Sequence, residues 1–180
     1  RLVPFPGSTE QGLYIVYRYP GGYIPYFNQC LPEALCDKLR NLGGEQAFEA
    51  PQAVVWLMQR YLSCHYEGRF VSEYLPRLSE PGEFLQVVKQ DEQFVVLDGD
   101  KPVCRAWSER SNAQCVEVAV ETHADHRRKG FARQAVTAWA HSVISSGLVA
   151  LYSHKADNHP SQALAHSLGA VWSAEVVCFG

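Results

Sequence analysis

The chain has 180 residues, of which 47% are hydrophobic and 19% charged, and its formal net charge is −3. This length and composition suit one folded domain and exclude a disordered or collagen-like chain. No apolar run approaches the roughly 18 residues of a membrane-spanning helix, and the acidic balance gives no general attraction to nucleic acid or an anionic membrane. The six cysteines form no CxxC pair, so we expect buried, reduced thiols and a cytoplasmic location.

The first half of the sequence predicts a hairpin and two helices. Two β-prone segments flank the turn residues Pro20-Gly21-Gly22, as in a β-hairpin. Leucines then recur near helical spacing before Gly43-Gly44, and a second apolar stripe follows Pro51. The expected elements are strands over 14–19 and 23–27 and helices over 31–42 and 51–62. The polar, turn-rich segment 79–83 is the predicted boundary between two parts of the chain.

The second half of the sequence alternates strands with helices. Valines alternate with other residues over Cys115–Glu121, which predicts a strand with one buried face. Apolar spacing from Arg128 to Val143 predicts an amphipathic helix. The other expected elements are strands over 94–97, 102–107, 148–152 and 171–179 and a helix over 160–168. A strand, helix, strand unit at the centre predicts an α/β or α+β layered fold.

A basic segment, HRRKGFAR, runs from His126 to Arg133 between the predicted strand and the predicted helix. A helix N-terminus exposes unpaired N–H groups that bind anions, whereas each cation there costs about 0.3–1 kcal/mol. The small residues Gly130 and Ala132 let a ligand approach the backbone. The segment therefore indicates a site for an anion such as a pyrophosphate, with a solvated basic first turn as the alternative. It matches neither the dinucleotide fingerprint GxGxxG nor the P-loop.

The same segment, read from Arg127 to Ala132, resembles the acyl-CoA motif [QR]-x-x-G-x-[GA] of the GNAT superfamily of N-acetyltransferases. Further along, Asn158-His159-Pro160-Ser161 and Leu168-Gly169-Ala170 resemble the second signature of that family. The strand expected over 148–152 lies where the family has its fifth strand. The two motifs occur in the family's order and spacing, and the resemblance covers residues 94–179.

The resemblance implies a GNAT-like fold, which is a mixed, mostly antiparallel sheet with a splayed parallel central strand pair, flanked by helices. It implies a single domain over residues 1–180, with 1–83 as a variable part on the acceptor side and 84–180 as the acyl-CoA-binding core. It also implies acetyl-CoA as the co-substrate.

The resemblance also assigns contacts with acetyl-CoA. The backbone groups of two strand residues are expected to pair with the pantetheine arm, as an added strand does. Backbone N–H groups of the basic segment are expected to hold the pyrophosphate, with arginine side chains adding positive charge. The expected cofactor-binding residues are Val120, Thr122, Arg127, Arg128, Lys129, Gly130, Phe131, Ala132, Arg133, Asn158 and Ser161.

The reaction requires a base, because an amine acceptor is mostly protonated near neutral pH. Glu117 and Glu121 lie on one face of the predicted central strand. Glu117 is the expected base and Glu121 the second candidate, with a structural role as the alternative for each. A backbone N–H at a bulge near Thr122 is expected to polarise the thioester oxygen.

The leaving thiolate receives a proton from a tyrosine in many members of the superfamily. This sequence has Ala165 at the matching position. Tyr152, His154 or water is therefore expected to serve instead.

The expected function is transfer of an acetyl group from acetyl-CoA to an amine of a small molecule or a peptide. Two alternatives stay open: an acyl-CoA-binding sensor without transferase activity, and transfer of a longer acyl chain. The seven histidines show no metal-ligand spacing, so no metal is expected. A homodimer is left open.

Overall fold

The computed structural model describes residues 12–76 and 87–180. The chain divides into two compact units: unit 1 runs up to Ser72 and includes Ser173–Gly180, and unit 2 is Glu73–Trp172. The boundary expected at residues 79–83 lies outside the described residues. The organisation as one domain over 1–180 stays a prediction.

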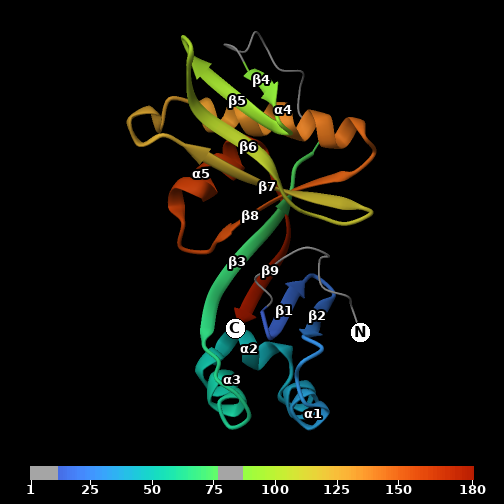
Figure 1. Cartoon of the computed structure of the whole chain (residues 1–180). Helices are drawn as coiled ribbons and strands as arrows, with labels where there is room; N and C mark the ends of the chain where they lie inside the picture. The colour runs from blue at the N-terminus through green and yellow to red at the C-terminus, as the bar shows by residue number, and fades with distance from the viewer. Residues whose placement is uncertain (1–11, 77–86) are drawn as a thin grey trace. The chain divides into compact units, whose positions relative to one another are not determined.

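Unit 1 contains a small sheet packed against helices (Figure 1). Its elements are β1 (Tyr14–Tyr19), β2 (Gly22–Phe27), α1 (Glu33–Leu42), α2 (Gly44–Glu49), α3 (Pro51–Met58), β3 (Tyr66–Tyr74) and β9 (Val171–Phe179). The strand order in this unit is β2–β1–β9–β3, and β1 pairs antiparallel with both β2 and β9. The boundary with unit 2 falls within β3 and β9.

The hairpin and the first helix of unit 1 confirm the sequence prediction. The hairpin ladder runs from the pair Tyr14–Phe27 to the pair Tyr19–Gly22. The first helix, α1, ends at Gly43, whose φ of 84° lies in the left-handed region that favours glycine. The second predicted helix is shorter than expected, because α3 ends at Met58. Neither α2 nor β3 was predicted, since α2 has only 6 residues and YEGRFVSEY of β3 lacks a regular alternation.

Aromatic residues dominate one part of the core of unit 1. The Tyr14 ring is 1% exposed and stacks on Phe27 and Phe179, with ring centroids 5.2 and 5.7 Å away. Burial raises the pKa of Tyr14 to about 12, so its hydroxyl stays neutral. Tyr14 is therefore part of the hydrophobic core of unit 1.

An ion triad links three strands of unit 1. The Glu175 carboxylate of β9 accepts hydrogen bonds from Arg18 of β1 and from Arg69 of β3, the latter at 2.7 Å. Burial raises the pKa of Glu175, but the hydrogen bonds from Arg69 and Arg18 outweigh this effect and hold it below its usual value. Both guanidinium groups also lie against the Phe48 ring, 4.7 and 5.5 Å from its centroid.

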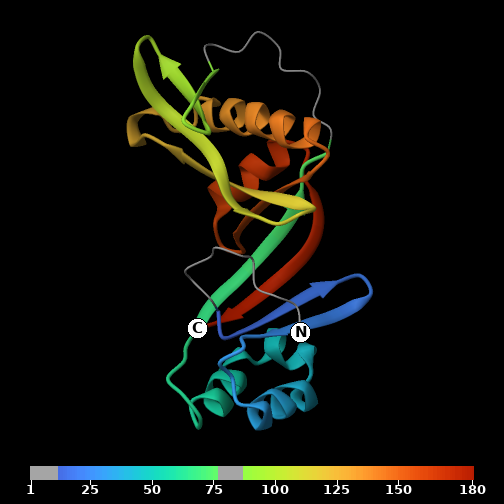
Figure 2. The same cartoon turned by 45° about the vertical axis from the view of Figure 1, so that its right-hand side comes forward.

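The described part of unit 2 contains a second set of strands and the helices α4 and α5 (Figures 1 and 2). Its elements are β4 (Val87–Gln90), β5 (Gln93–Asp98), β6 (Lys101–Ser111), β7 (Cys115–Thr122), α4 (Phe131–Ser145), β8 (Val149–Lys155) and α5 (His159–Ser167). The strand order is β8–β7–β6–β5–β4, in which β7 and β8 are parallel and the other neighbours antiparallel. This mixed, mostly antiparallel arrangement with flanking helices confirms the predicted fold class.

Helix α4 packs its apolar stripe on the strands of unit 2. Trp139 is 1% exposed, and its Nε1 donates a hydrogen bond to Ser108 Oγ of β6 at 3.0 Å. Val116 and Val118 of β7 face the same core. The alternating residues of β7, which include Glu117, therefore project from the opposite face.

The start of α4 corrects the sequence prediction. The helix begins at Phe131, three residues after the expected start at Arg128. The physical reason is backbone conformation, because Arg128 and Gly130 have φ values of 61° and 82° and cannot continue a right-handed helix. The residues from Arg127 to Gly130 instead form a loop after a short 3₁₀ turn, Ala124–His126.

All six cysteines lie in the described part of the chain, and none of them forms a disulfide there. Cys36, Cys64 and Cys104 are buried as expected, whereas Cys30 is exposed. No helix among residues 12–76 and 87–180 is long and apolar enough to cross a membrane.

Candidate active site

The parallel strands β7 and β8 separate partway along their length. In the described residues their ladder runs from the pair Cys115–Val149 to the pair Glu117–Leu151. Beyond it, β7 continues to Thr122 and β8 to Lys155. Figure 1 shows the two strands diverging on the side where β7 leads into the loop before α4. The splayed central pair predicted from the sequence is therefore present.

One edge of β7 lacks a strand partner beyond the point of separation. His123 N–H donates to Val103 O at 2.9 Å, and hydrogen-bonded pairs in an antiparallel ladder recur at every second residue. The same parity turns the backbone groups of Glu121 toward β6. It turns those of Val120 and Thr122 toward the space between β7 and β8. The two residues predicted to pair with an extended ligand thus present their N–H and C=O groups at the open edge.

The loop after β7 contains two residues in the left-handed conformation. Arg128 pays a conformational cost there, and such strained residues occur preferentially at ligand-binding loops. Gly130 is the N-cap of α4, and a Cβ built on it would meet no atom within 4 Å. The space next to this glycine is therefore open. Phe131 and Ala132, the first residues of the helix, are half-buried against the core.

Positive charge gathers around the first turn of α4. This turn has no acidic residue and no side-chain cap, so its first N–H groups lack an acceptor within the helix. Arg127, Arg128 and Lys129 lie exposed in the loop, and Arg133 lies exposed in the first turn. Arg127 Nε donates to Thr122 O at 3.4 Å, which ties the loop to the end of β7. Unpaired amides, cations and open space together form a cradle suited to a phosphate group.

The two candidate carboxylates of β7 differ in their surroundings. Glu121 is exposed, and its Oε2 accepts hydrogen bonds from Nε and Nη2 of Arg105 at 3.0 and 2.7 Å. Glu117 is half-buried, and its carboxylate has no hydrogen-bond or ion-pair partner in the described chain. The Glu117 carboxylate is therefore free to accept a proton, whereas that of Glu121 is already engaged.

The irregularity in the ladder between β6 and β7 lies in β6 and not near Thr122 of β7, which corrects the expected position of the bulge. Pairing is regular from Cys104–Thr122 to Ser108–Val118 and shifts between Ser108 and Arg110. The extra residue, Glu109, accepts a hydrogen bond from Trp107 Nε1 at 2.7 Å. This end of β6 is exposed, so an additional residue fits there without disturbing the core.

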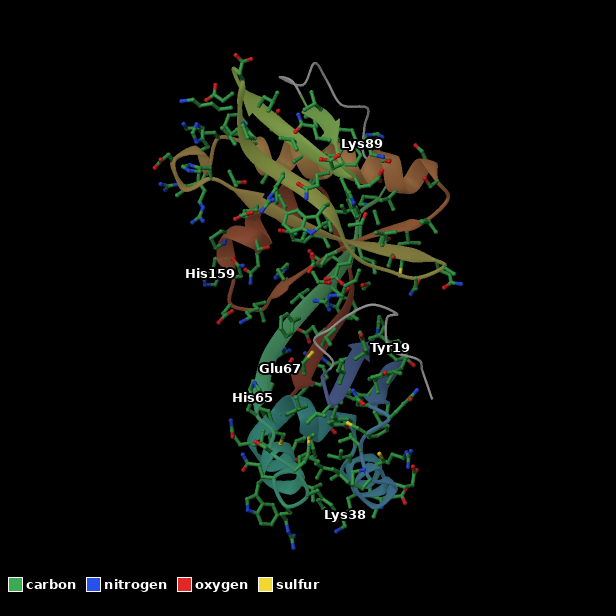
Figure 3. All side chains as sticks on the ribbon, viewed as in Figure 1. Tyr19, Lys38, His65, Glu67, Lys89 and His159 are labelled. Carbon is green, nitrogen blue, oxygen red and sulfur yellow. The ribbon has the colours of Figure 1, made fainter. Side chains whose placement is uncertain are left out.

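A buried tyrosine lies next to the point where β8 leaves β7. Tyr152 directly follows Leu151, the last residue of β8 that pairs with β7, and is 3% exposed. Its hydroxyl lies 2.6 Å from Ser161 Oγ of α5. Burial raises the pKa of Tyr152, although the hydrogen bond with Ser161 lowers it in part. Ser161 N–H donates to Asn158 Oδ1, the N-cap of α5, at 3.2 Å. Asn158 and Ser161, both predicted from the sequence, are thus held together at the start of α5, which exposed His159 marks in Figure 3.

The other candidates for the proton donor have different surroundings. Ala165 is 1% exposed and belongs to the core of unit 2. His154 is buried, with Nδ1 2.9 Å from Lys155 O and Nε2 3.7 Å from Glu73 Oε2. That carboxylate oxygen is buried and, among the described residues, has no hydrogen-bond partner. Sequence reasoning missed Glu73, because it lies in the unpredicted strand β3 and belongs to no motif.

Unit 1 holds a cavity of about 320 Å³ beside β2 and α1. The residues lining it are Pro25, Tyr26, Phe27, Asn28, Gln29, Leu31, Glu33, Cys36 and Arg40. The Tyr26 hydroxyl is buried and has no hydrogen-bond partner in the described chain. The same part of the chain contains no group of three or more His, Cys, Asp or Glu residues able to hold a metal ion.

Comparisons with known proteins agree with this arrangement. The family model described as GNAT acetyltransferase matches residues 89–179. A GNAT-family protein from Novosphingobium aromaticivorans has a similar fold with a TM-score of 0.54 at 14% identity, over 64% of this chain and 66% of that one. A GNAT-family acetyltransferase from Colwellia psychrerythraea gives a TM-score of 0.56 at 11% identity, over 87% of this chain and 75% of that one. No match was found among curated proteins.

The chain thus spans about two thirds of the length of the first of these structures. At such low identities the structural likeness shows the fold alone. The family model, however, covers more than half of the chain and includes β7, the basic loop, α4, β8 and α5. The chain therefore belongs to the GNAT acetyltransferase family.

Proposed function

We propose that the protein transfers an acetyl group from acetyl-CoA to the amine of a small molecule or a peptide. The observation that carries this proposal is the separation of β7 from β8 after the pair Glu117–Leu151. It leaves a free backbone edge on β7 that leads directly into the phosphate cradle at the start of α4. An extended ligand with amides at one end and phosphates at the other fits such a continuous arrangement.

The residues around this opening fit acetyl-CoA in two ways. The N–H groups of Val120 and Thr122 and the C=O group of Val120, which face the open edge of β7, can pair with the amides of the pantetheine arm, as in strand addition. The Thr122 C=O group accepts a hydrogen bond from Arg127 Nε. The open space at Gly130 and the surrounding cations can take the pyrophosphate. When bound, acetyl-CoA supplies an activated acetyl group as a thioester.

Within this proposal Glu117 is the base. Its unpartnered carboxylate takes the proton from the acceptor amine, directly or through one water. The acceptor nitrogen forms a bond with the acetyl carbon, the bond between that carbon and sulfur breaks, and the electron pair stays on sulfur. Glu121 instead keeps its hydrogen bonds with Arg105 and has a structural role.

Isothermal titration with acetyl-CoA tests the proposal directly. We expect saturable binding that weakens as salt is added, because cations line the phosphate cradle. Absence of binding at millimolar acetyl-CoA would overturn the proposal. Propionyl- and succinyl-CoA, tested alongside, distinguish acetyl transfer from transfer of a longer acyl chain.

The base is tested by comparing two variants of one strand. We expect Glu117→Gln to lower kcat by about 10²-fold or more at neutral pH with little change in the Kd of acetyl-CoA, since a general base contributes about 10²–10⁴-fold. Glu121→Gln is the matched control and should keep most of the activity. Equal losses in the two variants would place the base elsewhere.

A second candidate function is an acyl-CoA sensor without transferase activity. The buried Ala165, at the position where the family has a proton-donating tyrosine, favours it. Binding of acetyl-CoA without release of CoA thiol across a broad panel of amines would support the sensor. Thiol release with any amine would support the transferase.

The described residues of unit 2 do not identify the amine that accepts the acetyl group. We propose that the variable part, residues 1–83, selects the acceptor. The cavity beside β2 and α1, with its unpartnered Tyr26 hydroxyl, is the described feature of unit 1 best suited to this task. Tyr26→Phe should then change the relative rates with different amines while leaving the Kd of acetyl-CoA unchanged.

A further inference from the structure

We infer that Ser161, oriented by the buried hydroxyl of Tyr152, donates a hydrogen bond to the sulfur atom of coenzyme A and so stabilises the leaving thiolate. This inference rests on the proposed function, because it names the group that meets the sulfur in the same site. It extends that function to two residues of β8 and α5.

The surroundings of the Tyr152 and Ser161 hydroxyls favour one direction for the hydrogen bond between them. Their oxygen atoms lie 2.6 Å apart, and either one is able to donate. Tyr152 is 3% exposed, so its proton needs a protein acceptor, and a buried O–H left without one is costly. Ser161 Oγ is its hydrogen-bond partner in the structure. Tyr152 is therefore the donor and Ser161 the acceptor.

The hydroxyl hydrogen of Ser161 is available to a ligand. With Tyr152 donating, the hydrogen of Ser161 is left over, and no acceptor for it occurs among the described residues. Ser161 is half-buried rather than buried, so this hydrogen can reach a ligand. The Ser161 N–H is already held by Asn158 Oδ1, which fixes the serine at the start of α5. A donor that is fixed, oriented and unused is a preorganised binding group.

The position of Tyr152 in β8 relates it and its partner Ser161 to the separation of β7 and β8. Tyr152 is the first residue of β8 beyond the ladder with β7, so its backbone lies where the strands begin to separate. Its hydroxyl lies 2.6 Å from Ser161 Oγ. Glu117, the proposed base, is in the last residue pair of that ladder. The amine proton leaves toward Glu117 while the electron pair of the broken C–S bond goes to sulfur. A hydrogen bond from Ser161 meets the charge that develops there, and solvent protonates the thiolate later.

The raised pKa of Tyr152 is consistent with this direction of donation, because the hydroxyl then keeps its proton well into the alkaline range. The titratable groups near Tyr152 are Glu73 and His154, the latter with its ring centroid 6.2 Å from that of the tyrosine. When two ligands are compared at one pH, the charge states of Glu73 and His154 affect both affinities alike and cancel in their ratio.

The test compares the binding of CoA with that of desulfo-CoA, which lacks the sulfur. Titrations are run at pH 9.5 with a reductant present, so that the thiolate form of CoA is populated, since thiols ionise in the alkaline range. We expect the wild-type protein to bind CoA about tenfold more tightly than desulfo-CoA. Ser161→Ala and Tyr152→Phe should each reduce this preference to within about twofold, and the double variant should lose no more, because the two hydroxyls act as one unit.

Ser167→Ala is the matched control, since it removes a hydroxyl from the same helix, where Ser167 donates only to Leu164 O. It should keep the tenfold preference. A purely structural role of Tyr152 would weaken both ligands equally and leave their ratio unchanged. Equal affinity of the wild-type protein for the two ligands, or a preference that survives Ser161→Ala, would overturn the inference while the proposed function stands. Failure of the wild-type protein to bind either ligand would instead overturn the proposed function.

Discussion

Replacing Gly130 by alanine tests whether a phosphate approaches the start of α4. Gly130 has a φ of 82°, and a Cβ at this position would meet no protein atom within 4 Å. The folded protein can therefore hold the methyl group without a clash. The cost is conformational, about 1–2 kcal/mol for an L-residue in the left-handed region.

The same substitution should weaken acetyl-CoA much more than it weakens the fold. The methyl group would occupy the open space that we assign to the pyrophosphate. We expect the Kd of acetyl-CoA to rise at least tenfold, equivalent to about 1.4 kcal/mol. Isothermal titration at fixed salt measures this change, and thermal denaturation measures the loss of stability separately.

Gly147→Ala is the matched control for this experiment. Gly147 follows the other end of α4, has a φ of 80° and likewise has open space around a Cβ. Its substitution should cost the same conformational free energy and leave the Kd unchanged. Equal Kd values of acetyl-CoA for Gly130→Ala and the wild-type protein would refute the phosphate cradle. An equal loss of affinity in Gly130→Ala and Gly147→Ala would mean that lower stability causes the effect.

Three further predictions concern stability and thiol chemistry. Glu175→Gln should lower the free energy of unfolding by about 1–2 kcal/mol at neutral pH, because charged hydrogen bonds to two arginines are weakened. The pKa of Glu175 is lowered in the folded state. Its contribution to stability is therefore present above the unfolded carboxyl pKa of about 4.3 and is lost as the pH falls through the lower folded pKa. In acid, denaturant titrations of the wild-type protein and of Glu175→Gln should therefore give the same free energy of unfolding. Trp139→Ala should cost about 3–5 kcal/mol in the same titrations, since it removes a fully buried side chain and leaves Ser108 Oγ without its donor; a cost below 1 kcal/mol would contradict the packing of α4. Cys30 should react first with an alkylating reagent in the native protein, while Cys104, whose pKa burial raises, should react only on unfolding; mass spectrometry of partly alkylated protein checks this order.

Local features of the amino-acid sequence determined a large part of the fold. The alternation over Cys115–Glu121 predicted β7 to within one residue, and glycine near the end of an apolar stripe predicted where α1 and α5 end. Such signals are local, because side-chain spacing and left-handed glycines act within a few residues. The elements that were missed, α2, β3 and β4, are short or lack a regular alternation, so their local patterns are weak.

The sequence by itself also determined the family and named most of the residues that we propose for the site. The spacing of Arg127, Gly130 and Ala132 and that of Asn158 and Ser161 sufficed, because a phosphate cradle and a helix N-cap each need residue types at fixed local offsets. The start of α4 was misplaced because the left-handed conformation of Arg128 leaves no mark in the residue type.

Only the tertiary structure decided how those residues differ from one another. Glu117 and Glu121 look alike in the sequence, and each has an arginine opposite it on β6. Arg105 donates hydrogen bonds to the Glu121 carboxylate, whereas Arg110 makes no ion pair with Glu117 in the described part of the chain. The pairing of Tyr152 with Ser161 likewise depends on α5 packing beside β8. Hydrogen bonds between separate elements follow from how strands and helices pack, and this packing is set by the whole core rather than by the spacing of residues along one segment.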